Sequence, residues 1–237
     1  MSPTINLSFL EHLEELRIRI IKSVCAIILF TILSYMFSDN IIDILILPVK
    51  DVEVSFQVLK ITSVFLIKIG ISFVCGLFLS FPIILYQFLK FVLPAFEKDI
   101  SIVKIFLAIL FCFLLFVTGL LFGYYVLIPL SITFFNSLSL DLNFLSINYT
   151  LENYLVYLIW VLIISSSIFQ LPFILMLLNR IGIVSKEFLQ GHRKHIVVLF
   201  FILAALFTPP DPVSQILVVI PLYILFEISI LLTKKKQ

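Results

Sequence analysis

The sequence predicts an all-α integral membrane protein, a single polytopic domain over residues 1–237 with six transmembrane helices. Apolar residues make up 62% of the chain and charged residues only 13%, against about 45–50% and about 25% in soluble domains. The mean hydropathy of +1.24 agrees. The apolar residues also come in long runs, and a helix needs about 20 of them to cross a hydrocarbon core near 30 Å thick.

The first four spans are expected at about 20–37, 62–89, 105–130 and 154–178. An amphipathic helix over about 8–19 should precede the first span, because its leucines recur at helical spacing opposite charged residues. The first apolar stretch is longer than the apolar core of a signal peptide, and no small-residue cleavage site follows it. We therefore expect no cleaved leader within it.

The last two spans, about 196–208 and 213–232, are expected to form a short hairpin, because only the sequence TPPDP separates their apolar runs. Residues 196–207 would cover about 18 Å at 1.5 Å per residue, less than the hydrocarbon core. Pro209 and Pro210 should end the helix, because proline lacks an N–H donor and clashes with the preceding turn. The hairpin should leave the bilayer locally thin.

The basic residues predict the orientation of the chain. Of the 16 Lys and Arg residues, all except Lys50, Lys60 and Lys68 lie at the two ends of the chain, between spans two and three, or between spans four and five. Loops rich in Lys and Arg stay on the cytoplasmic side of a membrane. Both termini should therefore face the cytoplasm or the equivalent stromal compartment.

One acidic cluster lies on this positive face. Glu11, Glu14 and Glu15 precede the first span, close to Arg17 and Arg19. One interpretation is an ordinary interfacial helix in which the pairs Glu14–Arg17 and Glu15–Arg19 neutralise each other. The other is a receptor surface for an arginine-bearing peptide, because the guanidinium fork binds carboxylates bidentately.

Several polar residues fall within the spans, where such residues are either paired or functional. Lys68 can extend its ammonium to the outer face, Gln170 can hydrogen-bond a neighbouring helix, and Glu227 is expected to pair inward. The three cysteines lie in apolar runs without CxxC spacing, which indicates small core residues. We expect no metal site and no cofactor.

Five stretches carry a family resemblance, in order along the chain: FLEHLEELRIRI, FLSFPIILYQFLKFVLPAFEKD, GYYVLIPLSITFF, FQLPFILMLLNRIGIVS and FTPPDPVSQILVVIPLYILFEI. Together they resemble the TatC family, the largest subunit of the twin-arginine protein translocases of bacteria, plastids and some mitochondria. The resemblance covers essentially the whole chain, and its combination of motifs is specific.

The resemblance implies a receptor that binds the Arg-Arg signal peptides of folded proteins. With small single-span TatA/TatB-type subunits, such a receptor moves its cargo across the lipid bilayer using the proton-motive force. It implies six helices with both termini inside, a homo-oligomer within the complex, no enzymatic activity and no binding of nucleic acid. The absence of a GxxxxGK[ST] motif is consistent with transport without nucleotide hydrolysis.

The resemblance also implies site residues. Those expected at the signal peptide are Glu15, His12, Leu16, Arg17, Glu97 and Asp99. The last two are included because a second glutamate of the family, six residues after the proline that matches Pro94, is Ile100 in this chain. The intramembrane and partner-contact residues are expected to be Lys68, Gln170, Thr208, Asp211, Gln215 and Glu227.

The alternative functions are a small-molecule transporter and a structural subunit. A proton- or ion-coupled transporter of small molecules would show paired broken helices and inverted repeats, and neither is visible in the sequence. A purely structural assembly subunit fits the composition, but it would not distinguish Arg-Arg from Lys-Lys peptides. For location, the richness in Phe, Ile, Leu and Lys and the presence of Gln170 favour a plastid thylakoid membrane over a bacterial inner membrane.

Overall fold

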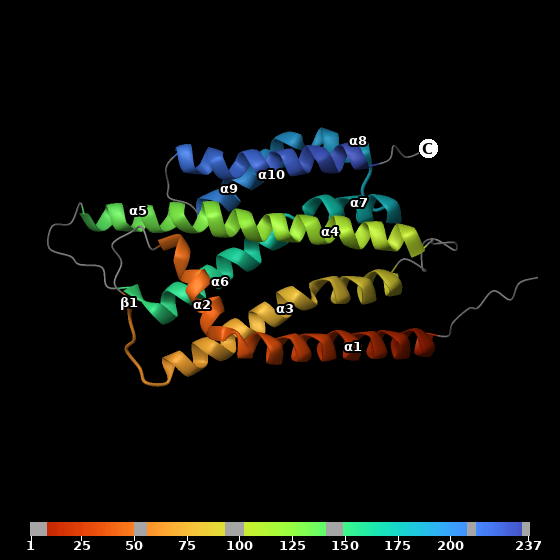
Figure 1. The fold of residues 1–237 in the computed structure, drawn as a ribbon. Helices are drawn as coiled ribbons and strands as arrows, with labels where there is room; N and C mark the ends of the chain where they lie inside the picture. The colour runs from red at the N-terminus through yellow and green to blue at the C-terminus, as the bar shows by residue number, and fades with distance from the viewer. Residues whose placement is uncertain (1–8, 50–55, 93–101, 141–148, 208–211, 234–237) are drawn as a thin grey trace, which may run out of the picture. The chain divides into compact units, whose positions relative to one another are not determined.

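The computed structural model describes residues 9–49, 56–92, 102–140, 149–207 and 212–233, and nearly all of them are helical (Figure 1). Four residues expected at functional sites lie outside these ranges: Glu97, Asp99, Thr208 and Asp211. The chain divides into two compact units, one made of residues 1–41 and 68–113 and the other of residues 42–67 and 114–237.

The elements follow one another in a simple order. The first part of the chain holds α1 (Phe9–Met36), α2 (Ser38–Ile46), the 3-10 turn η1 (Leu47–Val49), α3 (Ser63–Val92), α4 (Ile102–Phe122), the π-turn η3 (Gly123–Leu127) and α5 (Ile128–Leu140). The second part holds α6 (Leu151–Ile168), α7 (Leu171–Ile181), α8 (Lys186–Gly191), α9 (Arg193–Phe207) and α10 (Pro212–Leu232). Two short strands that the sequence did not predict, β1 (Phe56–Gln57) and β2 (Tyr149–Thr150), pair in parallel.

The first unit is built on α1 and α3. The amphipathic segment predicted at 8–19 and the first span are continuous in α1, which contains neither glycine nor proline to interrupt it. The two helices come very close at Gly76, where a Cβ atom would lie 2.6 Å from the backbone nitrogen of Thr31. Small residues at helix interfaces allow this close backbone approach in membrane proteins.

The second unit has its core around α6, where Leu155, Leu158 and Val161 are fully buried. Helix α10 packs against both α9 and α7. A second close approach joins α4 to α6, where the Ser165 hydroxyl donates to the Gly119 carbonyl at 2.7 Å. Serine hydroxyls that bond across helices supply part of the attraction that apolar side chains cannot provide in lipid.

Prolines account for two interruptions within the long helices. Pro129 has no N–H to donate to the Tyr125 carbonyl, and the π-turn η3, where Ile128 N–H bonds to the Gly123 carbonyl, occupies this weakened stretch. Pro172 likewise leaves the carbonyl of Ile168 without its helical donor, and α6 ends at that residue.

Two tyrosine contacts hold the backbone near a third proline in the second unit, and the proline explains the first of them. Pro48 cannot donate to the carbonyl of Ile44, and the hydroxyl of Tyr124 donates there instead. The hydroxyl of Tyr154 donates to the next carbonyl, that of Leu45, at 2.8 Å. The backbone leading from α2 into η1 is therefore held by side chains from η3 and α6, which satisfy its exposed acceptors.

Three helical stretches of the described chain are long and apolar enough to cross a membrane: Ser63–Val92, Ile105–Asn136 and Leu151–Ile181. A fourth is obtained if α1 and α2, which are joined at a bend, are taken as one span, and Gln215–Leu231 forms a shorter apolar helix. Large apolar side chains such as Ile32 and Phe106 are exposed on these helices, as expected where lipid covers them. The fold is that of a multi-pass membrane protein, and the count of six spans stays a prediction.

Candidate functional site

The first unit contains a polar groove of about 540 Å³ between α1 and the last turns of α3. Its lining consists of Glu11, Glu14, Glu15, Ile18, Arg19 and Lys22 from α1, with Tyr86, Gln87 and Lys90 from α3. The α1 residues recur at intervals of three and four, so a continuous helix presents them on one side. The α3 residues share a face for the same reason.

Glu15 is the most enclosed carboxylate of this groove. Arg19 donates to Glu15 Oε1 from both Nε, at 3.1 Å, and Nη2. On the other oxygen, His12 Nδ1 lies 3.8 Å from Glu15 Oε2. The imidazole in turn stacks on Phe91 of α3, with ring centroids 4.4 Å apart. Glu15 is thus held by two neighbours on its own helix, and α3 supports this arrangement through the ring of His12.

Glu14 is held differently. Its Oε1 accepts from Arg17 Nη2 at 3.3 Å, and the two side chains are 64% and 69% exposed, against 36% for Glu15. The structure confirms both ion pairs predicted from spacing, Glu14–Arg17 and Glu15–Arg19. Exposed pairs contribute little to stability, typically below about 1 kcal/mol, so the Glu14 pair is a weak interaction that a ligand could exchange easily.

The electrostatic balance of the groove is mixed. Three carboxylates face three basic groups, those of Arg19, Lys22 and Lys90. The carbonyls at the carboxyl end of α3 add partial negative charge nearby, which favours a cationic ligand. A cation that enters the groove can thus gain contacts with several acceptors, but only by competing with basic side chains already present.

The structure brings together some of the predicted signal-peptide residues and not others. Glu15 lines the groove and His12 lies beside it, whereas Leu16 and Arg17 are, like His12, not among the described residues of the lining. Sequence reasoning did not assign the α3 side of the site: Tyr86, Gln87, Lys90 and Phe91. Their helical spacing near the inner end of α3 was a usable signal, but it did not reveal which other helix they would face.

Two charged residues expected within the membrane have ionic partners. In the first unit, the Lys68 ammonium lies 2.6 Å from Asp39 Oδ1. In the second unit, Glu227 of α10 accepts from Arg193 Nη2 of α9 at 3.0 Å and from the Tyr223 hydroxyl at 2.9 Å. The inward pairing predicted for Glu227 is confirmed, and its partner holds the last hairpin together at one end.

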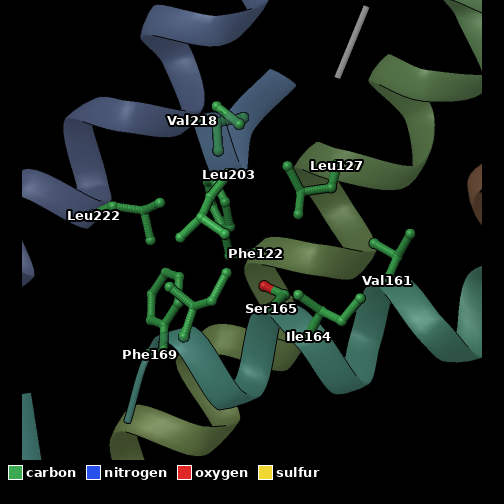
Figure 2. A pocket seen from close by; sticks show the side chains of 11 residues that line it. Phe122, Leu127, Val161, Ile164, Ser165, Phe169, Leu203, Val218 and Leu222 are labelled. Atoms are coloured by element: carbon green, nitrogen blue, oxygen red, sulfur yellow. The ribbon is translucent and has the colours of Figure 1, made fainter. Parts of the chain in front are cut away.

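Gln170 lies at the junction of α6 and α7 and is only 9% exposed. The neighbouring cavity is apolar and small, about 10 Å³, with Ser165 as its polar lining residue (Figure 2). Figure 2 shows side chains from α6, α9, α10 and the α4–η3 region converging on this space. An apolar void of this size is too small to hold a ligand.

No group of three or more potential metal ligands occurs in the described parts of the chain. Cys25, Cys75 and Cys112 are free thiols there. Gln215, which was expected to contact a partner, is half-buried near the start of α10. Among the described residues, a space of about 190 Å³ is lined by residues that include Lys60 and Glu152, whereas the α1–α3 groove is larger, at about 540 Å³, and has six charged side chains in its lining.

The chain as a whole matches one protein family. The family model described as "Sec-independent protein translocase protein (TatC)" matches residues 11–221, from the first turn of α1 into the first half of α10. The chain belongs to the TatC family. Its members are subunits of a protein translocase that works with other subunits in a membrane.

Individual TatC proteins are similar over nearly their full length. The Sec-independent protein translocase protein TatCy of Bacillus subtilis (strain 168) is 34% identical over 229 residues, covering 96% of this chain and 89% of the relative. An uncharacterized tatC-like protein of Reclinomonas americana, ymf16, is 36% identical and covers 98% of this chain and 89% of its own length.

Solved TatC structures agree with the fold. A crystal structure of the twin arginine translocase receptor TatC has a TM-score of 0.76 and 31% identity, covering 94% of this chain and 98% of that chain. A crystal structure of the same receptor in DDM has a TM-score of 0.79, also at 31% identity, and covers 94% of this chain and all of that one.

Proposed function

We propose that this chain is the receptor subunit of a twin-arginine translocase and that it binds Arg-Arg signal peptides in the α1–α3 groove. The observation that carries the proposal is Glu15, a carboxylate held by Arg19 and His12 of its own helix beside accessible space. Guanidinium groups bind carboxylates in a planar, bidentate geometry. The family membership favours this function over the alternative of a small-molecule transporter.

The groove also offers acceptors for the second arginine of such a peptide. Glu14 directly precedes Glu15, Glu11 lies one turn before it, and both line the groove with it. Glu97 and Asp99, outside the described residues, follow α3 in the sequence and are proposed to complete the site from the adjoining loop. His12 supports Glu15, whereas Leu16 and Arg17 are proposed to contact the peptide from the flank of α1.

Binding of matched peptides tests this function. The full-length protein in lipid nanodiscs is titrated with a fluorescent signal peptide that carries Arg-Arg, and with the same peptide carrying Lys-Lys. Because lysine presents a point charge and not a fork, we expect the Arg-Arg peptide to bind at least about tenfold more tightly, a difference of roughly 1.4 kcal/mol. Equal affinities, or no binding, would reject the receptor function.

The partner subunits are proposed to be single-span TatA/TatB-type proteins that dock along the α9–α10 hairpin, near Thr208, Asp211 and Gln215. The apolar helix at 215–231 is shorter than the stretches long enough to span the membrane, and a thin region of bilayer would favour binding of a neighbouring helix. Photocrosslinkers at Ala205 and Gln215 should capture a small subunit in intact membranes. A crosslinker at Leu66, on α3, is the control; equal capture there would argue against a dedicated surface.

The remaining proposals follow from the same assignment. We propose six spans with both termini in the cytoplasm or stroma, a homo-oligomeric receptor complex, and transport driven by the proton-motive force without enzymatic activity. Lys68 and Gln170 are proposed to lie beside the path of the signal peptide through the membrane. The thylakoid location stays a prediction, which detection of the protein in isolated thylakoids of its source organism would test.

A further inference from the structure

The groove already contains a guanidinium at the carboxylate proposed to receive the signal peptide. Arg19 directs two of its nitrogens to the same oxygen of Glu15, and its side chain is only 13% exposed. The second oxygen faces His12 at 3.8 Å. Arg17, by comparison, is 69% exposed and makes one longer contact. Glu15 is therefore not an open acceptor in this structure.

A bidentate bond between an arginine and a carboxylate uses both carboxylate oxygens, one for each arm of the fork. An incoming arginine that bonds to Glu15 in this way needs Oε1, where the Arg19 guanidinium lies. We infer that Arg19 is an internal competitor of the signal peptide: it occupies Glu15 in the free receptor, and binding exchanges one arginine for another. This inference rests on the proposed function of the groove.

The exchange sets a threshold for binding. The peptide must replace the contact that it breaks, so the apparent affinity is reduced by the strength of the Arg19–Glu15 interaction. Helical ion pairs of this kind are individually weak. Removing Arg19 should therefore raise the affinity of the receptor for an Arg-Arg peptide about two- to fivefold.

The threshold applies equally to every peptide that uses Glu15. The free-energy cost of displacing Arg19 is the same for an Arg-Arg and a Lys-Lys peptide. This cost therefore cancels in the ratio of the two affinities. Removing Arg19 should raise both affinities by the same factor and leave the ratio unchanged. The biological effect is that weakly matching cationic segments need a higher concentration to bind than they would need without Arg19.

The test compares three variants of the full-length protein in nanodiscs by peptide titration. Arg19→Gln removes the competitor, and Arg19→Lys keeps its charge but loses the fork. Lys22→Gln removes one positive charge from the same groove, one helical turn from Arg19. We expect the largest rise in affinity for Arg19→Gln, an intermediate rise for Arg19→Lys and the smallest for Lys22→Gln. Raising the salt from 0.15 M to 0.5 M screens the long-range attraction between the groove and the peptide. The effect of the direct Arg19–Glu15 contact on affinity should persist at the higher salt concentration.

Each result decides for or against the exchange. A lower affinity in Arg19→Gln would mean that Arg19 positions Glu15, and equal rises in Arg19→Gln and Lys22→Gln would mean a general charge effect; both overturn the inference. A changed ratio of Arg-Arg to Lys-Lys affinity would place Arg19 in contact with the peptide, which also overturns it. Failure of the wild-type protein to bind any peptide would instead reject the proposed function.

Discussion

At the scale of single residues, neighbouring carboxylates in α1 differ in environment. Glu15 is only about a third exposed and is held by Arg19 and His12, whereas Glu14 is mostly exposed and pairs with the exposed Arg17. Electrostatic interactions strengthen as water is excluded, since the effective dielectric constant falls. The sequence has three glutamates within five residues, and the fold encloses Glu15 more than Glu14.

This difference predicts unequal effects of two isosteric substitutions. Glu15→Gln should weaken binding of an Arg-Arg peptide about tenfold or more, because a charge-assisted hydrogen bond contributes about 1.5–3 kcal/mol. Glu14→Gln should weaken it by less than about fivefold, as expected for an exposed pair. Titration at fixed salt measures both, and unchanged melting temperatures control for folding. Unchanged affinity in Glu15→Gln would show that these carboxylates stabilise only the helix.

The same residues show which contacts of the site could be predicted from the sequence and which could not. The pairs within α1 follow from helical spacing alone, since positions three and four apart are neighbours on any helix. The contact of His12 with Phe91 could not be deduced, because it depends on how far α1 and α3 are offset along their axes. Tyr86 and Lys90 were missed for the same reason: their chemistry is ordinary until another helix supplies the opposite wall.

At the scale of elements, close approach of backbones determines which helices pair. Gly76 and Gly70 lie on α3 within the first unit, but only Gly76 abuts another backbone, that of Thr31. A Cβ at Gly70 would meet nothing within 4 Å. The two glycines look alike in sequence, yet one is needed for packing and the other only weakens the helix.

Alanine substitutions should therefore act in opposite directions. Gly76→Ala should destabilise the first unit by about 1–3 kcal/mol, the usual cost of forcing extra atoms into a packed interface. Gly70→Ala should be neutral or stabilising by up to about 1 kcal/mol, because alanine is the better helix former. Thermal unfolding in one detergent, followed by loss of helical circular dichroism, compares them. Similar effects at both positions would contradict the packing role of Gly76.

Apolar runs predicted helices well, because length and hydropathy are local properties. They did not predict where one run would be broken. The end of α6 at Ile168 and the start of α7 at Leu171 fall inside the stretch expected as a single span, 154–178. Pro172 was visible in the sequence, but proline can kink a membrane helix or end it, and the outcome depends on which neighbours satisfy the freed carbonyl.

At the scale of the whole molecule, charge asymmetry is the principal argument for orientation. Basic residues concentrate in alternate loops, and family membership agrees with a multi-pass membrane protein. Three stretches of the described chain are long enough to span, or four with the bent pair α1–α2. The two remaining crossings of the predicted topology require the short α9–α10 hairpin to traverse the bilayer.

Cysteine labelling in a cysteine-free background tests this topology. Asp141→Cys and Asp211→Cys should react with an impermeant maleimide added outside, because they follow the third and fifth spans. Glu187→Cys and Lys236→Cys should react only after the membrane is opened, because the predicted orientation places both inside. Labelling of Lys236→Cys from outside in intact vesicles would show that the orientation is the reverse of the predicted one. If Asp211→Cys reacts only after the membrane is opened, the hairpin does not cross the bilayer.

The π-turn η3 has a genetic consequence. It accommodates one more residue than a regular α-helix would in the same space, and each residue turns a helix by about 100°. Deleting one codon within 123–127 would remove the extra residue and restore a regular helix, so that Ile128 and Ile132 would keep their buried positions. The same deletion between Ile128 and Ile132 would instead rotate Ile132 and the residues after it by about 100° and take Ile132 out of the core. Single-residue deletions should therefore be tolerated within η3 and not in the regular helix that follows it.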